Sequence, residues 1–339
     1  MIYGLRVFAI GGGTGLSTLL AGLRRYVEPP QPSTNESVYI ADIAAMVTVT
    51  DDGGSSGRLR DEFQMVPPGD IRNCLVALSE DESLLSSLFQ YRFAGNGDLG
   101  GHNFGNLFLT ALTAVTGDFS EALRAAGHVL AVRGRIFPST TACVSLVAEL
   151  EDGRRLRGET NIVQADARVR RVFLDPPDCA PPEDALVALR QADLVLLGPG
   201  SLYTSLLPNL LVPGVCDALA SSNSMVVHVS NVMTQPGETT GYSLTDHVRA
   251  LTHHCPGLRL SHILANGTPI PAETLARYQD EGSLPVTLDA SDDLPCPVAV
   301  EDLLLPGPFV RHDGVRTAKA LLELFHRARV SVGGQRVRG

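Results

Sequence analysis

Short apolar runs alternate with amphipathic helical stripes along most of this chain. The run LRVFAI at 5–10 predicts a buried strand, and the glycine turn GGGTG leads from it into a helix. In that helix the apolar side chains recur at helical spacing and mark the face that we expect to be buried: Leu16, Leu19, Leu20 and Leu23. The chain therefore opens with a strand, turn and helix unit of the kind that builds parallel sheets.

The same alternation continues toward the C-terminus. A second strand at 38–50 ends at Asp51, and a long loop leads to a helix at 71–79 that we expect Asp70 to cap. Later strands are expected within 192–201, 224–232 and 260–267, and helices at 82–93, 105–115, 120–132, 183–191, 215–222, 244–254 and 315–328. This order predicts an α/β fold with a mainly parallel sheet and helices on both faces.

The pattern changes between 136 and 175. Two strand-like runs flank the turn signal EDGR, which predicts a β-hairpin insertion laid beside the main sheet. We expect residues 1–330 to form a single α/β domain that includes this insertion. The glycine-rich residues 331–339 predict a disordered tail, and the loop PPQPSTNES at 29–37 is also expected to be disordered.

Charge and composition exclude some classes of partner. The net charge of −10 supplies no basic field for nonspecific nucleic-acid binding, and no apolar run is long enough to predict membrane insertion. Lys319 is the single lysine, so the positive charge is almost wholly arginine. Genome composition is the simple explanation of this bias, and recognition of planar anions such as phosphate is the alternative.

The six cysteines are dispersed, with no C-x-x-C pair, and most stand among apolar or proline-rich neighbours. Such cysteines are typical of buried thiols in a reducing cytoplasm. The sequence therefore predicts buried free thiols at Cys74, Cys143, Cys179, Cys216, Cys255 and Cys296.

Four loops rich in glycine and polar residues each follow a predicted strand directly: GGGTG, DDGGSSGR, GPGSLYTS and NVMTQPGET. In a parallel α/β sheet, ligands bind beyond the carboxyl ends of the strands, near the point where the strand order reverses. We therefore expect these loops to converge on one binding site.

The first loop places Gly12, Gly13, Thr14 and Gly15 at the start of a helix, where free amide groups and the helix dipole favour phosphate. A dinucleotide fingerprint would need a third glycine where Leu16 stands, and no Gly-Lys-Ser/Thr follows. The loop is therefore neither a standard dinucleotide motif nor a P-loop. A tight turn that lets the helix pack closely is the alternative explanation of the glycines.

The second loop joins two adjacent carboxylates to a run of small residues. Asp51 and Asp52 have the chemistry to hold a divalent cation such as Mg²⁺ or to act as a base, whereas a solvated turn is the alternative. The glycines, hydroxyls and arginines that follow can donate to an anion. The candidates in this region are Asp51, Asp52, Gly53, Ser55, Ser56, Arg58, Asp70, Arg72 and Asn73.

Three further segments offer polar groups to the same site. In GGHNFGN, His102 can polarise a ligand oxygen, and a helix-capping loop is the alternative. The candidates in these segments are His102, Asn106, Gly198, Gly200, Ser201, Tyr203, Asn209, Asn231, Thr234 and Gln235.

Taken together, the segments GGGTGLS, VTVTDDGGSSGRLRDE, PPGDIRNCLVALS, GHNFGNL, GPGSLYTSLLPNLLVP and NVMTQPGET resemble the bacterial gluconeogenesis factor family (YvcK-like). That family shares a superfamily with 2-phospho-L-lactate transferase (CofD-like), an enzyme of deazaflavin cofactor synthesis. The resemblance runs in order from residue 7 to about residue 325.

The resemblance implies a Rossmann-like, doubly wound fold and a cytoplasmic regulator that links carbon metabolism to cell shape and cell wall synthesis. It implies a UDP-sugar ligand such as UDP-N-acetylglucosamine, a homodimer and a regulatory protein partner. It also implies that Tyr278 and Arg311 contact the UDP-sugar and that 266–312 covers it. An ordinary amphipathic helix position for Tyr278 and a surface ion pair for Arg311 are the alternatives.

Two other functions stay open at this point. A metal-dependent enzyme similar to 2-phospho-L-lactate transferase would use Asp51 and Asp52 to hold Mg²⁺, with Arg58 or Arg72 neutralising the leaving nucleotide. NAD-dependent hydride transfer is disfavoured by the missing third glycine, although NAD can occupy such a cleft as a surrogate dinucleotide.

Overall fold

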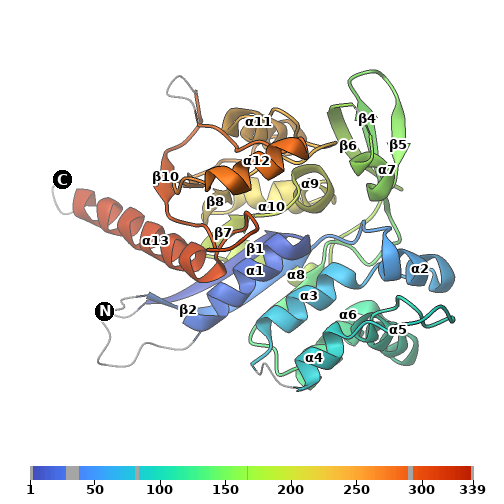
Figure 1. Cartoon of the computed structure of the whole chain (residues 1–339). Coiled ribbons are helices and arrows are strands. Elements are labelled where there is room, and N and C mark those ends of the chain that lie inside the picture. Colours follow the sequence, from blue (N-terminus) through green and yellow to red (C-terminus); the bar gives the residue numbers. More distant parts are fainter. Residues whose placement is uncertain (1–2, 28–37, 81–83, 166, 289–292, 337–339) are drawn as a thin grey trace.

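The computed structural model describes residues 3–27, 38–80, 84–165, 167–288 and 293–336, and a seven-stranded parallel sheet forms its centre (Figure 1). Across the sheet the strands are β10 (Val298–Glu301), β9 (His262–Asn266), β8 (Met225–Val229), β7 (Leu194–Leu197), β1 (Tyr3–Gly11), β2 (Val38–Val47) and β3 (Arg135–Pro138). The chain adds strands first on one side of β1 and then on the other, so the order reverses between β1 and β7. The predicted α/β fold with a doubly wound parallel sheet is confirmed.

Two separate groups of helices pack on this sheet. In the first group α1 (Gly13–Leu23) contacts both α3 (Gly69–Leu78) and α13 (Gly314–Arg336). In the second group α10 (Val215–Ser221) contacts α8 (Glu183–Gln191) and α9 (Leu207–Leu210), which in turn contact β1. The other helical elements are η1 (Arg24–Tyr26), α2 (Gly54–Phe63), α4 (Leu84–Gln90), α5 (Phe104–Thr116), α6 (Phe119–Val129), α7 (Glu159–Val163), η2 (Leu202–Leu206), α11 (Leu244–His254) and α12 (Ala272–Asp280).

Local sequence explains why these elements form where they do. All four residues of β7 are buried, as a continuous apolar run in a central parallel strand requires. The leucine stripe predicted for α1 is buried along its whole length. Asp118 caps the start of α6, because its side chain accepts a hydrogen bond from the Glu121 amide at 2.8 Å.

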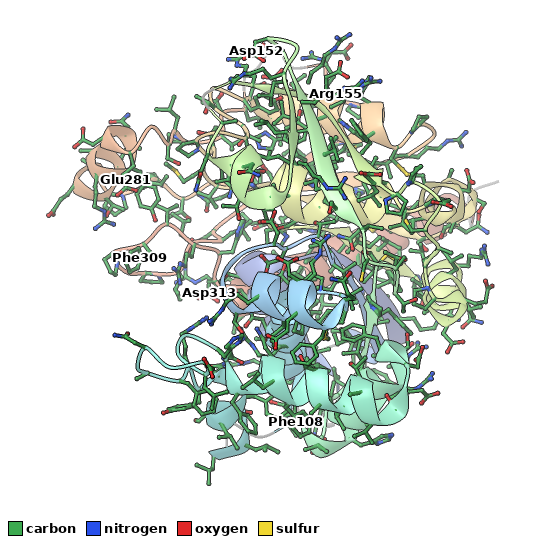
Figure 2. All side chains as sticks on the ribbon, turned by 90° about the vertical axis from the view of Figure 1, so that its right-hand side faces the viewer. Phe108, Asp152, Arg155, Glu281, Phe309 and Asp313 are labelled. Carbon is green, nitrogen blue, oxygen red and sulfur yellow. A yellow bond between two sulfur atoms is a disulfide. The ribbon has the colours of Figure 1, made fainter. Side chains whose placement is uncertain are left out.

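The strands between 136 and 175 do not extend the main sheet, apart from β3. They form a separate antiparallel sheet in the order β5-β4-β6, made of β5 (Arg155–Arg157), β4 (Ser145–Leu150) and β6 (Val169–Asp175). This sheet projects at one end of the molecule, with Asp152 and Arg155 near its tip and Phe108 of α5 at the opposite end (Figure 2). The predicted β-hairpin insertion is confirmed, and it forms a sheet of its own rather than extending the edge of the main sheet.

Four local predictions need correction. Strand β2 ends at Val47 rather than at Asp51, and the expected loop after it contains α2. Helix α3 has Pro68 at its N-cap position, and the carboxylate of Asp70 points instead toward α1. Helix α13 continues to Arg336 through residues predicted to be a disordered tail. Residues 337–339 and the loop predicted at 29–37 lie outside the described residues.

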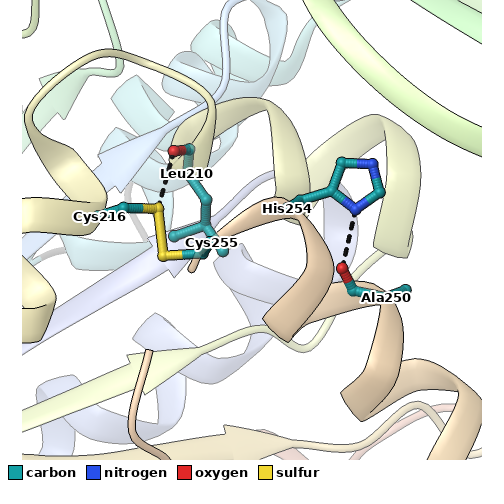
Figure 3. The surroundings of a disulfide bond; sticks show 5 residues. All are labelled: Leu210, Cys216, Ala250, His254 and Cys255. Carbon is teal, nitrogen blue, oxygen red and sulfur yellow. Dashed lines mark hydrogen bonds between the residues drawn. A yellow bond between two sulfur atoms is a disulfide. The ribbon is translucent and has the colours of Figure 1, made fainter. Parts of the chain in front are cut away.

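The prediction of free thiols is wrong for one pair of cysteines. Cys216 of α10 and Cys255, which follows α11, form a disulfide with their Cα atoms 5.5 Å apart (Figure 3). The pair is separated by 39 residues, so no short spacing in the sequence signals it. Cys74 and Cys179 are buried free thiols as predicted, whereas Cys143 is exposed and Cys296 is half-buried.

Among the described residues, no single helix has both the length and the apolar composition needed to cross a membrane. One pair of helical segments, Leu202–Leu210 with Val215–Ser221, meets both criteria together, but it is bent by 75°.

The contact between α1 and α13 depends on two glycines. A Cβ atom at Gly22 would lie 1.9 Å from the carbonyl oxygen of Gly314. We expect Gly22→Ala to lower the free energy of unfolding by about 1–3 kcal/mol, because backbone must move to relieve the overlap. Urea denaturation measures this loss. Gly97→Ala is the control, since a Cβ atom there meets nothing within 4 Å; equal effects of the two substitutions would contradict the expectation.

Candidate ligand-binding site

A cavity of about 380 Å³ lies beyond the carboxyl ends of β1, β7 and β8. The loops that follow these three strands form its wall, together with α12 and residues 305–312, which we call the strap. The predicted residues that line it are Gly12, Gly13, Thr14, Gly15, Gly200, Ser201, Asn231, Thr234, Gln235, Tyr278 and Arg311. The cavity thus lies where the strand order reverses, as is usual for ligand sites in doubly wound sheets.

The loops after β1 and β7 meet in this wall at very short range. A Cβ atom at Gly15 would lie 2.5 Å from the carbonyl oxygen of Pro199, so this position requires glycine. The amides of Thr14 and Gly15 belong to the first turn of α1, where no preceding turn supplies them with carbonyl partners. Close packing and exposure of amide donors are therefore two consequences of the same glycines.

A carboxylate from another helix caps α1. Oδ2 of Asp70 accepts a hydrogen bond from the Gly13 amide at 2.6 Å. Burial raises the pKa of Asp70 to about 6, and the nearby Asp51 carboxylate adds to the rise. The hydrogen bond from Gly13 opposes it. The role of Asp70 is thus to satisfy the start of α1, which sequence spacing could not reveal.

A second buried carboxylate accepts hydrogen bonds from donors of the loop after β7. Glu238 is 2% exposed and accepts hydrogen bonds from the Tyr203 amide at 3.2 Å and the Thr204 hydroxyl at 3.0 Å. Burial raises the pKa of Glu238 to about 7. The hydroxyl group of Tyr203 pairs with that of Tyr242 at 2.8 Å, so Tyr203 contributes its backbone rather than its side chain to this region.

The strap forms the outer wall and is attached to α12. The Val310 amide donates to the Tyr278 hydroxyl oxygen at 3.1 Å. Arg311 is exposed, and its guanidinium carbon lies 5.1 Å from the ring centroid of Phe309. Figure 2 shows Phe309 on the same side of the molecule as Glu281, the residue that follows α12. Tyr278 therefore holds the strap in place as well as lining the cavity.

His312 lines the cavity next to Arg311 and was missed in the sequence. Burial lowers the pKa of His312 to about 4, while a hydrogen bond to the Ser230 backbone opposes this shift. The ring is therefore neutral at pH 7. Its Nε2 atom and Oε1 of Gln235 are buried without a hydrogen-bond partner among the described residues. Only its position after the strap arginine could have drawn attention to His312.

A second hollow of about 410 Å³ adjoins this cavity and shares Asn231 and Val232 with it. Its wall is more apolar and includes Leu275, Val286 and residues after β9. The two hollows together give room for an extended ligand with a polar end and a less polar end.

A polar network lies beside the cavity and anchors the loop after β2 to α5. Ser55 Oγ lies 3.2 Å from His102 Nδ1 and accepts from the Asn106 side-chain amide at 3.2 Å. Arg72 donates to the side-chain oxygens of Asn106 at 3.0 Å and Asn73 at 2.6 Å. Burial, followed by the nearby Arg58 charge, lowers the pKa of His102. These side chains are thus already engaged with one another.

The carboxylates of Asp51 and Asp52 have different partners. Asp51 accepts from the Gly53 amide at 2.8 Å, and Asp52 accepts from the Thr160 hydroxyl at 2.7 Å. Burial raises the pKa of Asp51, and burial followed by the neighbouring carboxylates raises that of Glu159 to about 8. Within the described parts of the chain, no group of three or more His, Cys, Asp or Glu side chains is arranged to hold a metal ion.

Comparison with known proteins decides the family. The family model for 2-phospho-L-lactate transferase CofD matches residues 7–304. The gluconeogenesis factors of Halalkalibacterium halodurans and Bacillus subtilis are each 44% identical to this chain and cover 94% of it, over 95% and 98% of their own lengths. The chain belongs to the gluconeogenesis factor branch of the CofD family. A crystal structure of a UPF0052 family member from Bacillus halodurans matches with a TM-score of 0.87 and 44% sequence identity, covering 95% of this chain and 100% of that one.

In the present protein, the predicted site residues fall into three sets. The first lines the cavity. The second lies beside it and consists of Asp51, Asp52, Gly53, Ser55, Ser56, Arg58, Asp70, Arg72, Asn73, His102 and Asn106, with Asp70 reaching across to α1. The third set supports the loop after β7 and consists of Gly198, Tyr203 and Asn209. The side-chain amide of Asn209 donates to the Gly11 carbonyl oxygen at 3.0 Å. Glu159 and Glu238 were not predicted, because neither stands in a recognisable spacing.

The raised pKa of Asp70 makes the stability of the fold depend on pH. A carboxyl group with a higher pKa in the folded state stabilises the fold below its unfolded pKa of 3.8 and loses this contribution as the pH rises through about 6. We expect Asp70→Asn to raise the free energy of unfolding at pH 7.5 by about 2–3 kcal/mol relative to the native chain. The asparagine oxygen can still accept from Gly13.

Urea denaturation at pH 4 and pH 7.5 measures this difference, which should disappear at the lower pH. Asp61→Asn, at an exposed position of α2, is the control and should change stability little at either pH. An effect of Asp70→Asn that is the same at both values of pH would contradict the interpretation.

Proposed function

We propose that this protein is a cytoplasmic regulatory protein that binds a UDP-sugar, with UDP-N-acetylglucosamine as the expected ligand. The observation that carries the proposal is the meeting of two glycine loops with Tyr278 and Arg311 around one cavity at the β1/β7 switch. The relatives named gluconeogenesis factor support a role in carbon metabolism. Control of cell shape and cell wall synthesis is part of the same proposal.

The donors in the cavity suit a diphosphate. The start of α1 offers the amides of Thr14 and Gly15, and the positive end of the helix dipole favours an anion there. Ser201 adds a hydroxyl group from the facing loop, and Arg311 adds a guanidinium group. Among the described lining residues, Arg311 carries the one formal charge. An anionic ligand would therefore neutralise the positive charge of Arg311.

The lining residues favour binding over catalysis. Within the described residues, no carboxylate is part of the cavity wall, and the neutral ring of His312 is the one candidate base among the lining side chains. Asp70 and Glu238, the carboxylates that support the loops of this wall, accept hydrogen bonds from the protein itself. We therefore expect UDP-N-acetylglucosamine to be bound and released unchanged.

A metal-dependent transferase similar to 2-phospho-L-lactate transferase is the second candidate. The observation in its favour is the cluster of Asp51, Asp52 and Glu159 beside Asp70. After burial, the charges of the three aspartates contribute to the raised pKa of Glu159. In that case the cluster would gain a divalent cation such as Mg²⁺ from solution, and Arg72 would offset charge on the leaving nucleotide.

Arg311 provides the direct test of binding. We expect Arg311→Ala to weaken the binding of UDP-N-acetylglucosamine by about tenfold to a hundredfold, because charge-assisted hydrogen bonds to phosphate are lost. Isothermal titration calorimetry measures the dissociation constant. Arg249→Ala is the matched control, because Arg249 is an exposed arginine on α11 paired with Asp246. Equal affinities of the two variants would contradict the proposed site.

Product analysis separates the two candidate functions. After incubation with the protein, with and without Mg²⁺, we expect UDP-N-acetylglucosamine to be recovered intact by ion-exchange chromatography. Release of a nucleoside phosphate that requires Mg²⁺ and is abolished by Asp52→Asn would instead support the transferase.

A further inference from the structure

Arg311 differs from most arginines of the protein in how it is held. Its guanidinium group forms no hydrogen bond or ion pair with any described residue, whereas Arg6, Arg133 and Arg327 each pair with a carboxylate. The chain has 37 acidic and 27 basic residues, so carboxylates are not scarce. A cation left without an acidic partner at the wall of a cavity is available to an anionic ligand.

Phe309 supplies the contact that holds this guanidinium group. The guanidinium carbon of Arg311 lies over the Phe309 ring at 5.1 Å from its centroid, and that of Arg277 lies over the same ring at 5.6 Å. Phe309 is 55% exposed, so burial of its ring in the core does not explain its place on the strap. Its position is fixed from α12, since Arg277 donates to the Pro308 carbonyl and Tyr278 accepts from the Val310 amide.

Stacking and ion pairing have different consequences for an arginine. A carboxylate partner occupies the N–H groups along the edge of the guanidinium plane. An aromatic ring contacts the face of that plane and leaves the edge donors free. A guanidinium group held only by stacking is therefore oriented in advance and still able to donate two parallel hydrogen bonds to a phosphate.

We propose that Phe309 is a positioning residue that holds Arg311 by stacking, so that the free edge of the guanidinium group binds a phosphate group of the ligand. This inference rests on the proposed function, because it concerns the same cavity. It adds a residue that does not itself line the cavity and gives the contact that orients Arg311 for the diphosphate.

A double-mutant cycle tests the proposal. We expect Phe309→Leu to weaken the binding of UDP-N-acetylglucosamine by about threefold to fivefold, the loss typical of an exposed cation–π contact. Phe309→Tyr keeps an aromatic face and should restore the native affinity. In the Arg311→Ala background, Phe309→Leu should cause no further loss, because the group that it positions is absent.

The small sheet supplies a matched control. Arg155 lies over the ring of Phe173 at 5.8 Å, which is the same type of contact at a site remote from the cavity. Phe173→Leu should leave the dissociation constant unchanged. Thermal unfolding of each variant verifies that the fold is retained, so that a loss of affinity reports on the ligand site.

Titration with inorganic pyrophosphate separates this inference from the proposed function. Weaker binding of pyrophosphate by Phe309→Leu than by the native protein supports the inference. If the native protein binds pyrophosphate but not UDP-N-acetylglucosamine, the nucleotide-sugar proposal alone is refuted. Native affinity of Phe309→Leu for both ligands would overturn the inference alone. Additive losses in the double-mutant cycle would also overturn it, and failure of the native protein to bind either ligand would overturn both.

Discussion

The position of β1 between β2 and β7 is the constraint on which the rest of this structure depends. Because both neighbours run parallel to β1, their following loops must leave at the same edge of the sheet. The chain turns to one side after β1 and returns on the other side at β7, which opens a crevice between the two glycine loops. Gly15 then allows the loops to approach within contact distance, and the strap with α12 covers the remaining side.

Both loops at this crevice are stabilised by carboxylates from elsewhere in the chain. Asp70 and Glu238 satisfy amide and hydroxyl donors at the starts of α1 and η2, and burial raises the pKa of each. The protein thus stabilises the shape of this crevice with its own buried acids, and their contribution to stability varies with pH.

The antiparallel insertion packs against the loop after β2 and contributes residues to the acidic cluster there. Thr160 of α7 donates to Asp52, and Glu159 adjoins the carboxylates of the loop after β2. The acidic cluster therefore forms only when the insertion packs against the main domain. None of these carboxylates is part of the cavity wall, so the acidic cluster and the cavity are two separate features of the described structure.

The sequence by itself determined the longer strands, most helices and the glycine loops, because apolar periodicity and turn residues report local burial and backbone geometry directly. The short strands β3, β5 and β10 were not predicted, because three or four residues carry too little periodicity. It also predicted that four loops would converge, since parallel strands share a carboxyl edge. The loops after β1, β7 and β8 do line one cavity, whereas the loop after β2 is not part of its wall. Only the tertiary structure decided that Asp70 caps α1, that Cys216 pairs with Cys255 and that His312 joins the cavity wall. These contacts join residues far apart in the chain through packing, and no local pattern carries that information.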